Sequence, residues 1–275
     1  MILLDGKKLS QKILDELKDK IAKTKKQLRL AAVVVGKNPV TGKFIEQKKK
    51  TAANIGVAFR VYDFDEKIST NELRKRLADI VHEAKNTGVI IQLPLPAHIN
   101  AQYILNAIPP EKDVDVLSAR ASGNFYVGKS EVLPPVVGAV KTFFEEYGIE
   151  YKGKNAVVVG AGKLVGKPVA AWLTNEGVVV SVVNEYTKDI SEFTKKADII
   201  ISGAGKSKLI TGEMVKDGAI VVDAGTSESE GKIVGDVDFD SVSAKASYIT
   251  PVPGGVGPLT VAMLFKNLVT LAKAG

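Results

Sequence analysis

The sequence contains no cysteine and only two histidines, His82 and His98, in 275 residues. The absence of cysteine excludes disulfide bonds, a thiolate nucleophile and thiolate metal ligands. Two histidines are too few for a histidine-rich metal site, so no metal is expected. No apolar run reaches the ~18 residues of a membrane span, and residues 1–10 lack the apolar core of a signal peptide. We therefore expect a chain that does not associate with membranes, with the cytoplasm as the default compartment.

Arginine is scarce, although the net charge is +7. Lysine supplies most of the positive charge and is spread along amphipathic segments, whereas arginine is the residue preferred for bidentate phosphate recognition. The pattern favours a solvated surface over a nucleic-acid footprint, so no nucleic-acid partner is expected. A polyanionic substrate would also be attracted by the positive field. The five arginines are Arg29, Arg60, Arg74, Arg76 and Arg120.

Short apolar runs alternate with segments of helical periodicity along the whole chain. This order predicts α/β architecture with mostly parallel sheets. Residues 1–10 are expected to form a first strand and the start of a helix, and residues 118–135 to be irregular. Strands are predicted at 30–35, 58–64, 89–93, 155–159, 178–183, 199–202 and 220–223, and helices at 9–25, 41–54, 70–86, 101–107, 137–147, 165–175, 190–196 and 260–273.

The series of strands and helices starts a second time after the irregular stretch. We predict two α/β domains with a cleft between them, and a final helix that packs back on the first domain. The first domain comprises residues 1–136 with 256–275, and the second, Rossmann-like domain comprises residues 137–255.

A glycine turn lies between a predicted strand and a predicted helix in the second domain. Gly160 allows the tight turn, Gly162 and its neighbour Ala161 lie where a phosphate would approach, and Gly166 allows close helix packing. A turn of this kind at a helix N-terminus offers N–H groups to a pyrophosphate. The spacing is one residue longer than the usual fingerprint and is weak evidence alone, because many glycine turns bind nothing.

Glu185 closes the next predicted strand, about 20 residues past the glycines. An acid at this position accepts hydrogen bonds from ribose hydroxyls and repels a 2′-phosphate. The alternative is an ordinary exposed glutamate at a strand end. The pattern favours NAD over NADP, although Lys163 and Lys188 could still hold a phosphate.

Several segments match one known family in order along the chain. The most specific is Tyr248-Ile-Thr-Pro-Val-Pro-Gly-Gly-Val-Gly-Pro258, and the others are residues 89–96, 110–115, 165–168 and 235–238. On these segments the chain resembles the bifunctional methylenetetrahydrofolate dehydrogenase/methenyltetrahydrofolate cyclohydrolase family. The resemblance implies a two-domain α/β homodimer with tetrahydrofolate substrates and NAD or NADP as cofactor. It implies oxidation of 5,10-methylene- to 5,10-methenyl-tetrahydrofolate, followed by hydrolysis to 10-formyl-tetrahydrofolate.

The resemblance also implies roles for individual residues. Lys48 matches the catalytic lysine, Gln92 the glutamine that hydrogen-bonds it, and Asp115 the aspartate that grips the pterin. From the sequence alone, Lys48-Lys49-Lys50 equally resembles a solvated run of charge, Gln92 a structural amide and Asp115 a turn cap. Pro251, Gly254 and Gly255 would wall the folate site, although they also fit a plain turn.

The chain departs from the family pattern near the predicted folate site. Phe44 stands at a tyrosine position four residues before Lys48, so a hydroxyl partner of the lysine is missing. The ring can still stack on the pterin. Val116 replaces the glycine after Asp115, and Pro135-Val136-Val137 replaces Cys-Thr-Pro. Phe44 therefore puts cyclohydrolase efficiency in doubt more than folate binding.

Other departures lie at the predicted dinucleotide site. Ala161-Gly162 replaces Arg-Ser, Glu185 replaces a serine that contacts the 2′-phosphate, and Thr226 replaces an isoleucine at the nicotinamide end. Loss of the arginine and gain of Glu185 both weaken 2′-phosphate affinity, which predicts a change toward NAD.

Two alternative functions remain open. One is a dehydrogenase with weak or lost cyclohydrolase activity, which the loss of the tyrosine hydroxyl at Phe44 motivates. The other is a non-catalytic protein that binds folate or dinucleotide, which the number of changed positions motivates. Retention of Lys48, Gln92 and Asp115 together argues against the second.

Overall fold

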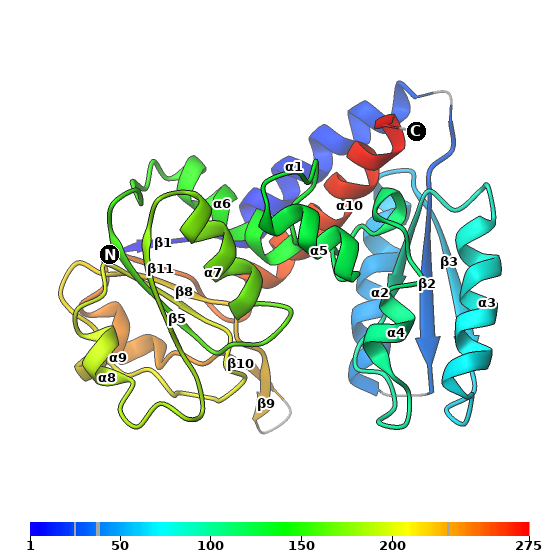
Figure 1. Ribbon diagram of the computed structural model, residues 1–275. Helices are drawn as coiled ribbons and strands as arrows, with labels where there is room; N and C mark the ends of the chain where they lie inside the picture. The colour runs from blue at the N-terminus through cyan, green and yellow to red at the C-terminus, as the bar shows by residue number, and fades with distance from the viewer. Residues whose placement is uncertain (25, 37–38, 230–231, 275) are drawn as a thin grey trace. The chain divides into compact units, whose positions relative to one another are not determined.

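The computed structural model describes residues 1–24, 26–36, 39–229 and 232–274. The chain divides into two compact units (Figure 1). The large-sheet unit comprises Met1–Ser10 with Pro135–Thr260, and the small-sheet unit comprises Gln11–Pro134 with Val261–Gly275. Helix α1 (Gly6–Ala22) begins in the first and continues into the second.

The small-sheet unit is built on a parallel sheet of order β3-β2-β4. The central strand pairs on both sides, with Ala32 opposite Val61 on one neighbour and Ile90 on the other. Parallel neighbours require crossover connections, and helices supply them. The elements are β2 (Arg29–Val35), α2 (Pro39–Asn54), β3 (Ala58–Phe64), α3 (Thr70–His82), β4 (Gly88–Ile91), α4 (Ala101–Leu105), the 3-10 turn η1 (Pro110–Lys112) and α5 (Ala119–Tyr126).

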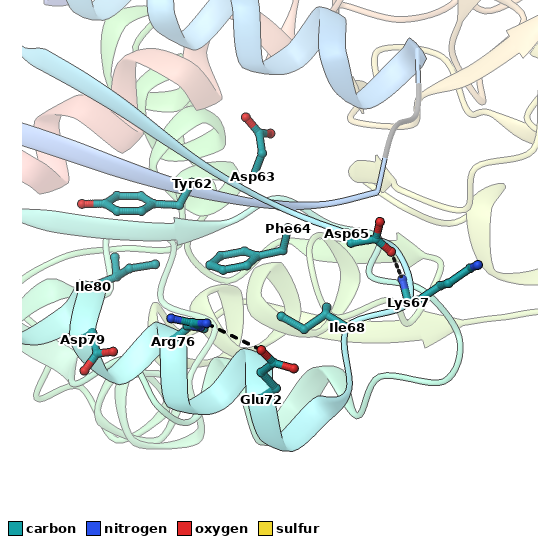
Figure 2. A pocket seen from close by; sticks show the side chains of 10 residues that line it. All are labelled: Tyr62, Asp63, Phe64, Asp65, Lys67, Ile68, Glu72, Arg76, Asp79 and Ile80. Atoms are coloured by element: carbon teal, nitrogen blue, oxygen red, sulfur yellow. Dashed lines mark hydrogen bonds and ion pairs between the residues drawn. The ribbon is translucent and has the colours of Figure 1, made fainter.

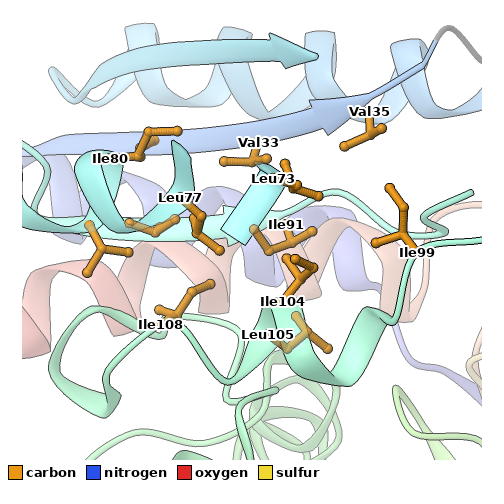
Figure 3. Packing of buried hydrophobic residues seen from close by; sticks show 13 residues of the cluster. Val33, Val35, Leu73, Leu77, Ile80, Ile91, Ile99, Ile104, Leu105 and Ile108 are labelled. Carbon is orange, nitrogen blue, oxygen red and sulfur yellow. The ribbon is translucent and has the colours of Figure 1, made fainter. Parts of the chain in front are cut away.

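The core of this unit fills both faces of the sheet. On one face, Val33 and Ile91 pack with Leu77 of α3 and Ile104 of α4 (Figure 3). On the other, a side chain at Gly88 would meet Leu268 of helix α10 (Val256–Ala274). The final helix therefore packs on the sheet of the small-sheet unit.

The large-sheet unit holds a parallel sheet of order β1-β11-β8-β7-β5-β6. The chain leaves β5 for β6 on one side, and then returns to place β7 on the other. This reversal is a topological switch point, where ligands bind at the carboxyl ends of the strands. The elements are β1 (Ile2–Leu3), α6 (Pro135–Glu146), β5 (Asn155–Val159), α7 (Gly166–Asn175), β6 (Val179–Val183), α8 (Ser191–Thr194), β7 (Ile199–Ser202), η2 (Gly212–Met214), β8 (Ile220–Asp223), β9 (Ser227–Ser229), β10 (Lys232–Val234), α9 (Phe239–Ser243) and β11 (Tyr248–Ile249).

The structure confirms the predicted α/β architecture and each predicted strand to within about two residues. It corrects the irregular stretch at 118–135, because α5 occupies residues 119–126. The antiparallel pair β9–β10, helix α9 and strand β11 were not predicted.

The first strand exists as predicted, but its pairing was unexpected. Ile2 and Leu3 pair with Tyr248 and Ile249, so β1 forms the edge of the larger sheet. Residues 1–10 therefore pack with the unit that holds most of the predicted 137–255 domain. The assignment of folate binding and dinucleotide binding to the two predicted domains stays a prediction.

In the part of the chain that the structure describes, no helix is both long enough and apolar enough to cross a bilayer.

Candidate functional site

Lys48 lies on the inward face of α2. Ile45 and Ala52 are buried, at 6% and 0% exposure, and stand three residues before and four residues after Lys48. This spacing puts all three side chains on one stripe of the helix. Lys48 is half-buried, whereas Lys49 and Lys50 are exposed. The three lysines in a row therefore do not form one solvated run.

Gln92 meets Lys48 at the carboxyl end of β4. Its backbone N–H donates to the Val33 carbonyl at 2.9 Å, which continues the ladder one residue past the strand. Its side-chain Nε2 donates to the Leu93 carbonyl at 3.0 Å, and its Oε1 accepts from Lys48 Nζ at 3.0 Å. The donor contact fixes the orientation of the amide, so an acceptor faces the lysine.

Asp113, not Asp115, holds the turn that follows η1. The buried Asp113 carboxylate accepts from the backbone N–H groups of Leu117 at 3.0 Å and Ser118 at 2.7 Å. Asp115 is half-buried and is electrostatically coupled to Lys48. The turn-cap role considered for Asp115 is therefore filled by Asp113.

Lys48, Gln92 and Asp115 form one cluster, and burial changes the pKa values of its two ionisable side chains. It lowers the pKa of Lys48 below 10.5, while the nearby Asp115 carboxylate opposes the change. Burial raises the pKa of Asp115 from 3.8 to about 6; Lys48 acts against this rise and Asp113 adds to it. Both groups are thus shifted toward their neutral forms. Lysines and carboxyls with shifts of this kind are typical of sites that move protons.

Two departures from the family pattern adjoin the cluster. Val116 adopts φ 58°, in the left-handed region that disfavours β-branched residues, and is 3% exposed. The valine therefore keeps the backbone conformation that glycine adopts most easily, at some cost in strain. Phe44 is half-buried one helical turn before Lys48.

The glycine turn of the larger sheet follows β5. Gly160 adopts φ 97°, and a side-chain carbon there would lie 2.6 Å from the Gly203 carbonyl oxygen. A carbon on Gly166 would lie 1.9 Å from the Gly160 carbonyl oxygen, so the start of α7 packs directly on the turn. Among the described residues, nothing lies within 4 Å of the equivalent position on Gly162. Gly160 and Gly166 are thus required by the chain itself, and the space at Gly162 is open.

The other predicted dinucleotide residues lie at the same edge of this sheet. Val183 pairs with Val159, and Gly160 N–H donates to the Val183 carbonyl at 2.8 Å, so the segment holding Glu185 starts beside the turn. The Glu185 and Thr226 side chains are exposed, and Ala161 is half-buried. Thr226 follows β8, two strands away from β5.

The predicted folate-wall residues lie in the large-sheet unit, after β11. Gly254 adopts φ 114°, and its carbonyl accepts from the Lys7 N–H at 3.0 Å. Gly255 N–H donates to the Pro251 carbonyl at 2.8 Å, and a carbon on Gly6 would lie 1.8 Å from the Gly255 oxygen. The loop is therefore pinned to the first turn of α1, and its role toward folate stays a prediction.

A separate groove of about 650 Å³ lies between β3 and α3 (Figure 2). Tyr62, Phe64 and Ile80 form its apolar part, and Asp65 and Arg76 are among the charged residues at its rim. None of the predicted site residues lines it.

In the large-sheet unit, a parallel sheet with a glycine turn at its switch point defines a Rossmann-type dinucleotide-binding unit. The small-sheet unit adds a half-buried lysine beside a carboxylate. Family models sharpen this class. Residues 4–115 match the catalytic domain of tetrahydrofolate dehydrogenase/cyclohydrolase, and residues 134–275 match its NAD(P)-binding domain. The chain belongs to the tetrahydrofolate dehydrogenase/cyclohydrolase family.

Individual relatives are similar to this chain over nearly its full length. The bifunctional protein FolD of Nitratiruptor sp. is 45% identical, with 99% of this chain and 98% of that protein covered. The FolD crystal structure from Campylobacter jejuni is 44% identical with a TM-score of 0.96, covering 100% of this chain and 99% of that one. The Trypanosoma brucei enzyme, solved with NADP and an inhibitor, is 34% identical with a TM-score of 0.95, covering 100% and 98%.

Proposed function

We propose that this chain oxidises 5,10-methylenetetrahydrofolate to the 5,10-methenyl form with NAD(P)+, and hydrolyses that product to 10-formyltetrahydrofolate. The observation that carries the proposal is the hydrogen bond between Lys48 and Gln92 beside Asp115, in the part of the chain that matches the family's catalytic domain. The NAD(P)-binding domain match supports the hydride acceptor.

Lys48 is the proposed proton carrier of the hydrolytic step. Because burial lowers its pKa, a larger fraction of its amine is neutral near pH 7 than in an exposed lysine. The neutral amine accepts a proton from water as the water adds to the methenyl carbon. When the bond between that carbon and one ring nitrogen breaks, the ammonium returns this proton to the nitrogen, and the remaining hydroxyl proton is released to solvent as the formyl C=O forms. Gln92 Oε1, at 3.0 Å, orients the amine during this exchange.

Asp115 is the proposed anchor for the pterin. The amino-pyrimidinone edge offers two neighbouring N–H donors, which a carboxylate accepts as a fork. The pKa of Asp115 is about 6, so the carboxylate remains mostly ionised at pH 7. Its charge also favours the ammonium form of Lys48, which links folate anchoring to proton transfer.

The proposed dinucleotide is NAD. Glu185 is exposed beyond β6, where its carboxylate would accept hydrogen bonds from the ribose hydroxyls and repel a 2′-phosphate. No arginine occurs after Arg120 to offset it. Steady-state assays with each dinucleotide should give a higher kcat/KM with NAD+. Equal efficiency with NADP+ would refute the preference and would point to Lys163 or Lys188 as phosphate partners.

The test of the main proposal is a two-step assay on the purified full-length chain. With 5,10-methylenetetrahydrofolate and NAD+, reduced dinucleotide and the methenyl product should appear together; added methenyl compound should then decay faster than in buffer. Absence of both reactions would overturn the proposal and leave a non-catalytic binding protein.

A second candidate is a dehydrogenase with weak hydrolysis. Phe44 supports it, because a phenyl ring one turn before Lys48 supplies no hydroxyl to the amine. Oxidation at a normal rate together with methenyl decay near the buffer rate would favour this candidate.

A homodimer is also proposed. Strand β3 stands at the edge of the smaller sheet, and such an edge pairs readily with a second copy. Light scattering should give twice the chain mass of 29.3 kDa; a monomer would refute the proposal. The cytoplasmic location expected from the sequence stays a prediction.

A further inference from the structure

Two buried aspartates lie beneath the carboxyl ends of the larger sheet. Asp223 ends β8 and is 2% exposed, and Asp236 follows β10 and is 0% exposed. Asp236 belongs to the segment 235–238, which matches the family but has no role in the function proposed above. Buried carboxylates are costly unless fully hydrogen-bonded, so their partners indicate what they hold together.

Asp236 binds the end of β7 and the loop after it. Its Oδ2 accepts from Ser202 Oγ at 2.7 Å and from the Ala204 N–H at 2.7 Å. Its Oδ1 accepts from the Lys206 N–H at 2.9 Å. One side chain therefore fixes residues 202, 204 and 206 of the loop at once.

This loop packs directly on the glycine turn. Gly203 N–H donates to the Val159 carbonyl at 2.8 Å, and the Gly203 carbonyl faces Gly160 so closely that a side chain at Gly160 would lie 2.6 Å from it. A carbon on Gly203 would lie 2.3 Å from Val165, the residue before α7. A shift of the loop would therefore displace both the turn and the start of the helix.

Asp223 connects the segment 235–238 to the end of β8. Its Oδ1 accepts from the Gly225 N–H and its Oδ2 from the Val237 N–H, both at 2.9 Å. A carbon on Gly235 would lie 2.0 Å from Asp223 Oδ2, and one on Gly225 would lie 2.2 Å from the Asp236 carboxyl. The two carboxylates therefore occupy the space that side chains at these glycines would need.

We propose that Asp236 is a positioning residue for the dinucleotide. It fixes the loop after β7 against the glycine turn and so sets the shape of the switch point between β5 and β7. It also occupies the N–H groups of Ala204 and Lys206, which directs phosphate binding to the glycine turn. The inference deepens the proposed dehydrogenase function and rests on it.

The test compares three variants of the full-length chain. Asp236→Asn replaces an acceptor oxygen by a donor, and Ser202→Ala removes one of the three contacts with little structural change. Asp198→Asn is the matched control. Asp198 joins β7 to β5 at the amino ends of these strands, where it accepts from the Asn155 N–H at 2.8 Å. For each protein, the Kd values of NAD+ and NADP+ are measured without folate. The KM and kcat of oxidation, the rate of methenyl hydrolysis and the Tm are measured alongside.

We expect Asp236→Asn to raise the dinucleotide Kd and KM about tenfold and Ser202→Ala about threefold, with kcat at saturating dinucleotide and the rate of hydrolysis changed less than about twofold. Asp198→Asn should lower the Tm and leave the Kd unchanged. If Asp236→Asn does not fold, Ser202→Ala decides the outcome.

Unchanged dinucleotide affinity in the folded variants would overturn this inference and leave the proposed function intact. An equal loss of affinity in Asp198→Asn, or a parallel loss of hydrolysis in Asp236→Asn, would also overturn it, because either result indicates general destabilisation. A parent chain that oxidises no folate and binds neither dinucleotide would overturn the proposed function together with the inference.

Discussion

The two units build their predicted sites from different kinds of chemical group. In the small-sheet unit, the cluster consists of side chains: Lys48, Gln92 and Asp115 extend from a helix, a strand end and a turn. In the large-sheet unit, the predicted dinucleotide site consists of backbone: Gly160 and Gly166 bring the turn and the helix together, with buried carboxylates behind them.

This difference determines what each site tolerates. In a site made of side chains, replacing one residue removes its functional group even when the fold is unchanged. A backbone site keeps its N–H groups under most substitutions but changes when the packing around it shifts. Single replacements should therefore abolish chemistry in the small-sheet unit and tune affinity in the large-sheet unit.

The largest effect is expected from Lys48→Met. Removal of the proposed proton carrier should slow methenyl hydrolysis by about 10²- to 10⁴-fold. The matched control is Lys49→Met, because the Lys49 side chain is 58% exposed and pairs only loosely with Glu46 at 3.8 Å. Equal losses of hydrolysis in the two variants would show that the inward position of Lys48 has no special role.

The next largest effect is expected from Glu185→Ser. Removing the negative charge beyond β6 should raise the ratio of kcat/KM for NADP+ over NAD+ about tenfold, which corresponds to about 1.4 kcal/mol. Glu192→Ser, on the exposed face of α8, is the control for a general change of charge in this unit. An unchanged ratio in Glu185→Ser would mean that dinucleotide choice lies elsewhere.

The third prediction concerns stability against pH. The folded pKa of Asp115, about 6, is raised above its ordinary 3.8, so the folded state retains a proton that the unfolded state releases in this interval. The parent should therefore lose stability relative to Asp115→Asn as pH rises from about 4 to 7, by up to about 2–3 kcal/mol. Urea unfolding of both proteins across this range measures the difference. A difference in unfolding free energy that stays constant with pH would contradict the raised pKa of the Asp115 carboxyl.

The smallest effect is expected from Phe44→Tyr. A hydroxyl one turn before Lys48 adds at most one hydrogen bond to the amine, which corresponds to about 1 kcal/mol, or about a fivefold faster hydrolysis. Oxidation should change less. An unchanged hydrolysis rate would show that the missing hydroxyl does not limit this chain, and would count against the weak-cyclohydrolase alternative.

The backbone site was the easier one to predict from sequence. Gly160 follows an apolar strand and Gly166 begins a helix, and that order is visible without a structure. Lys48 was hidden by its neighbours Lys49 and Lys50. Its spacing from Ile45 and Ala52 was an available signal, because it puts the lysine on the buried stripe of α2.

Other features depend on contacts between distant segments. Strand β11 has two residues, and only its pairing with β1 and β8 identifies it as a strand. Helix α5 was missed although Ser118 caps it by accepting from the Ala121 N–H at 3.3 Å, a signal that the irregular composition concealed. The proposed role of Asp236 could not be predicted from the sequence, because its three partners lie about 30 residues earlier in the chain.

The most direct test of the side-chain site is an NMR titration of the Lys48 side-chain amine, assigned by its loss in Lys48→Met. We expect a pKa below 10.5 in the parent, because burial is the dominant influence on the amine. In Asp115→Asn the pKa should fall further, because a carboxylate that favours the ammonium form is gone. A parent pKa at or above 10.5, or one that Asp115→Asn leaves unchanged, would contradict a half-buried lysine that interacts with that aspartate.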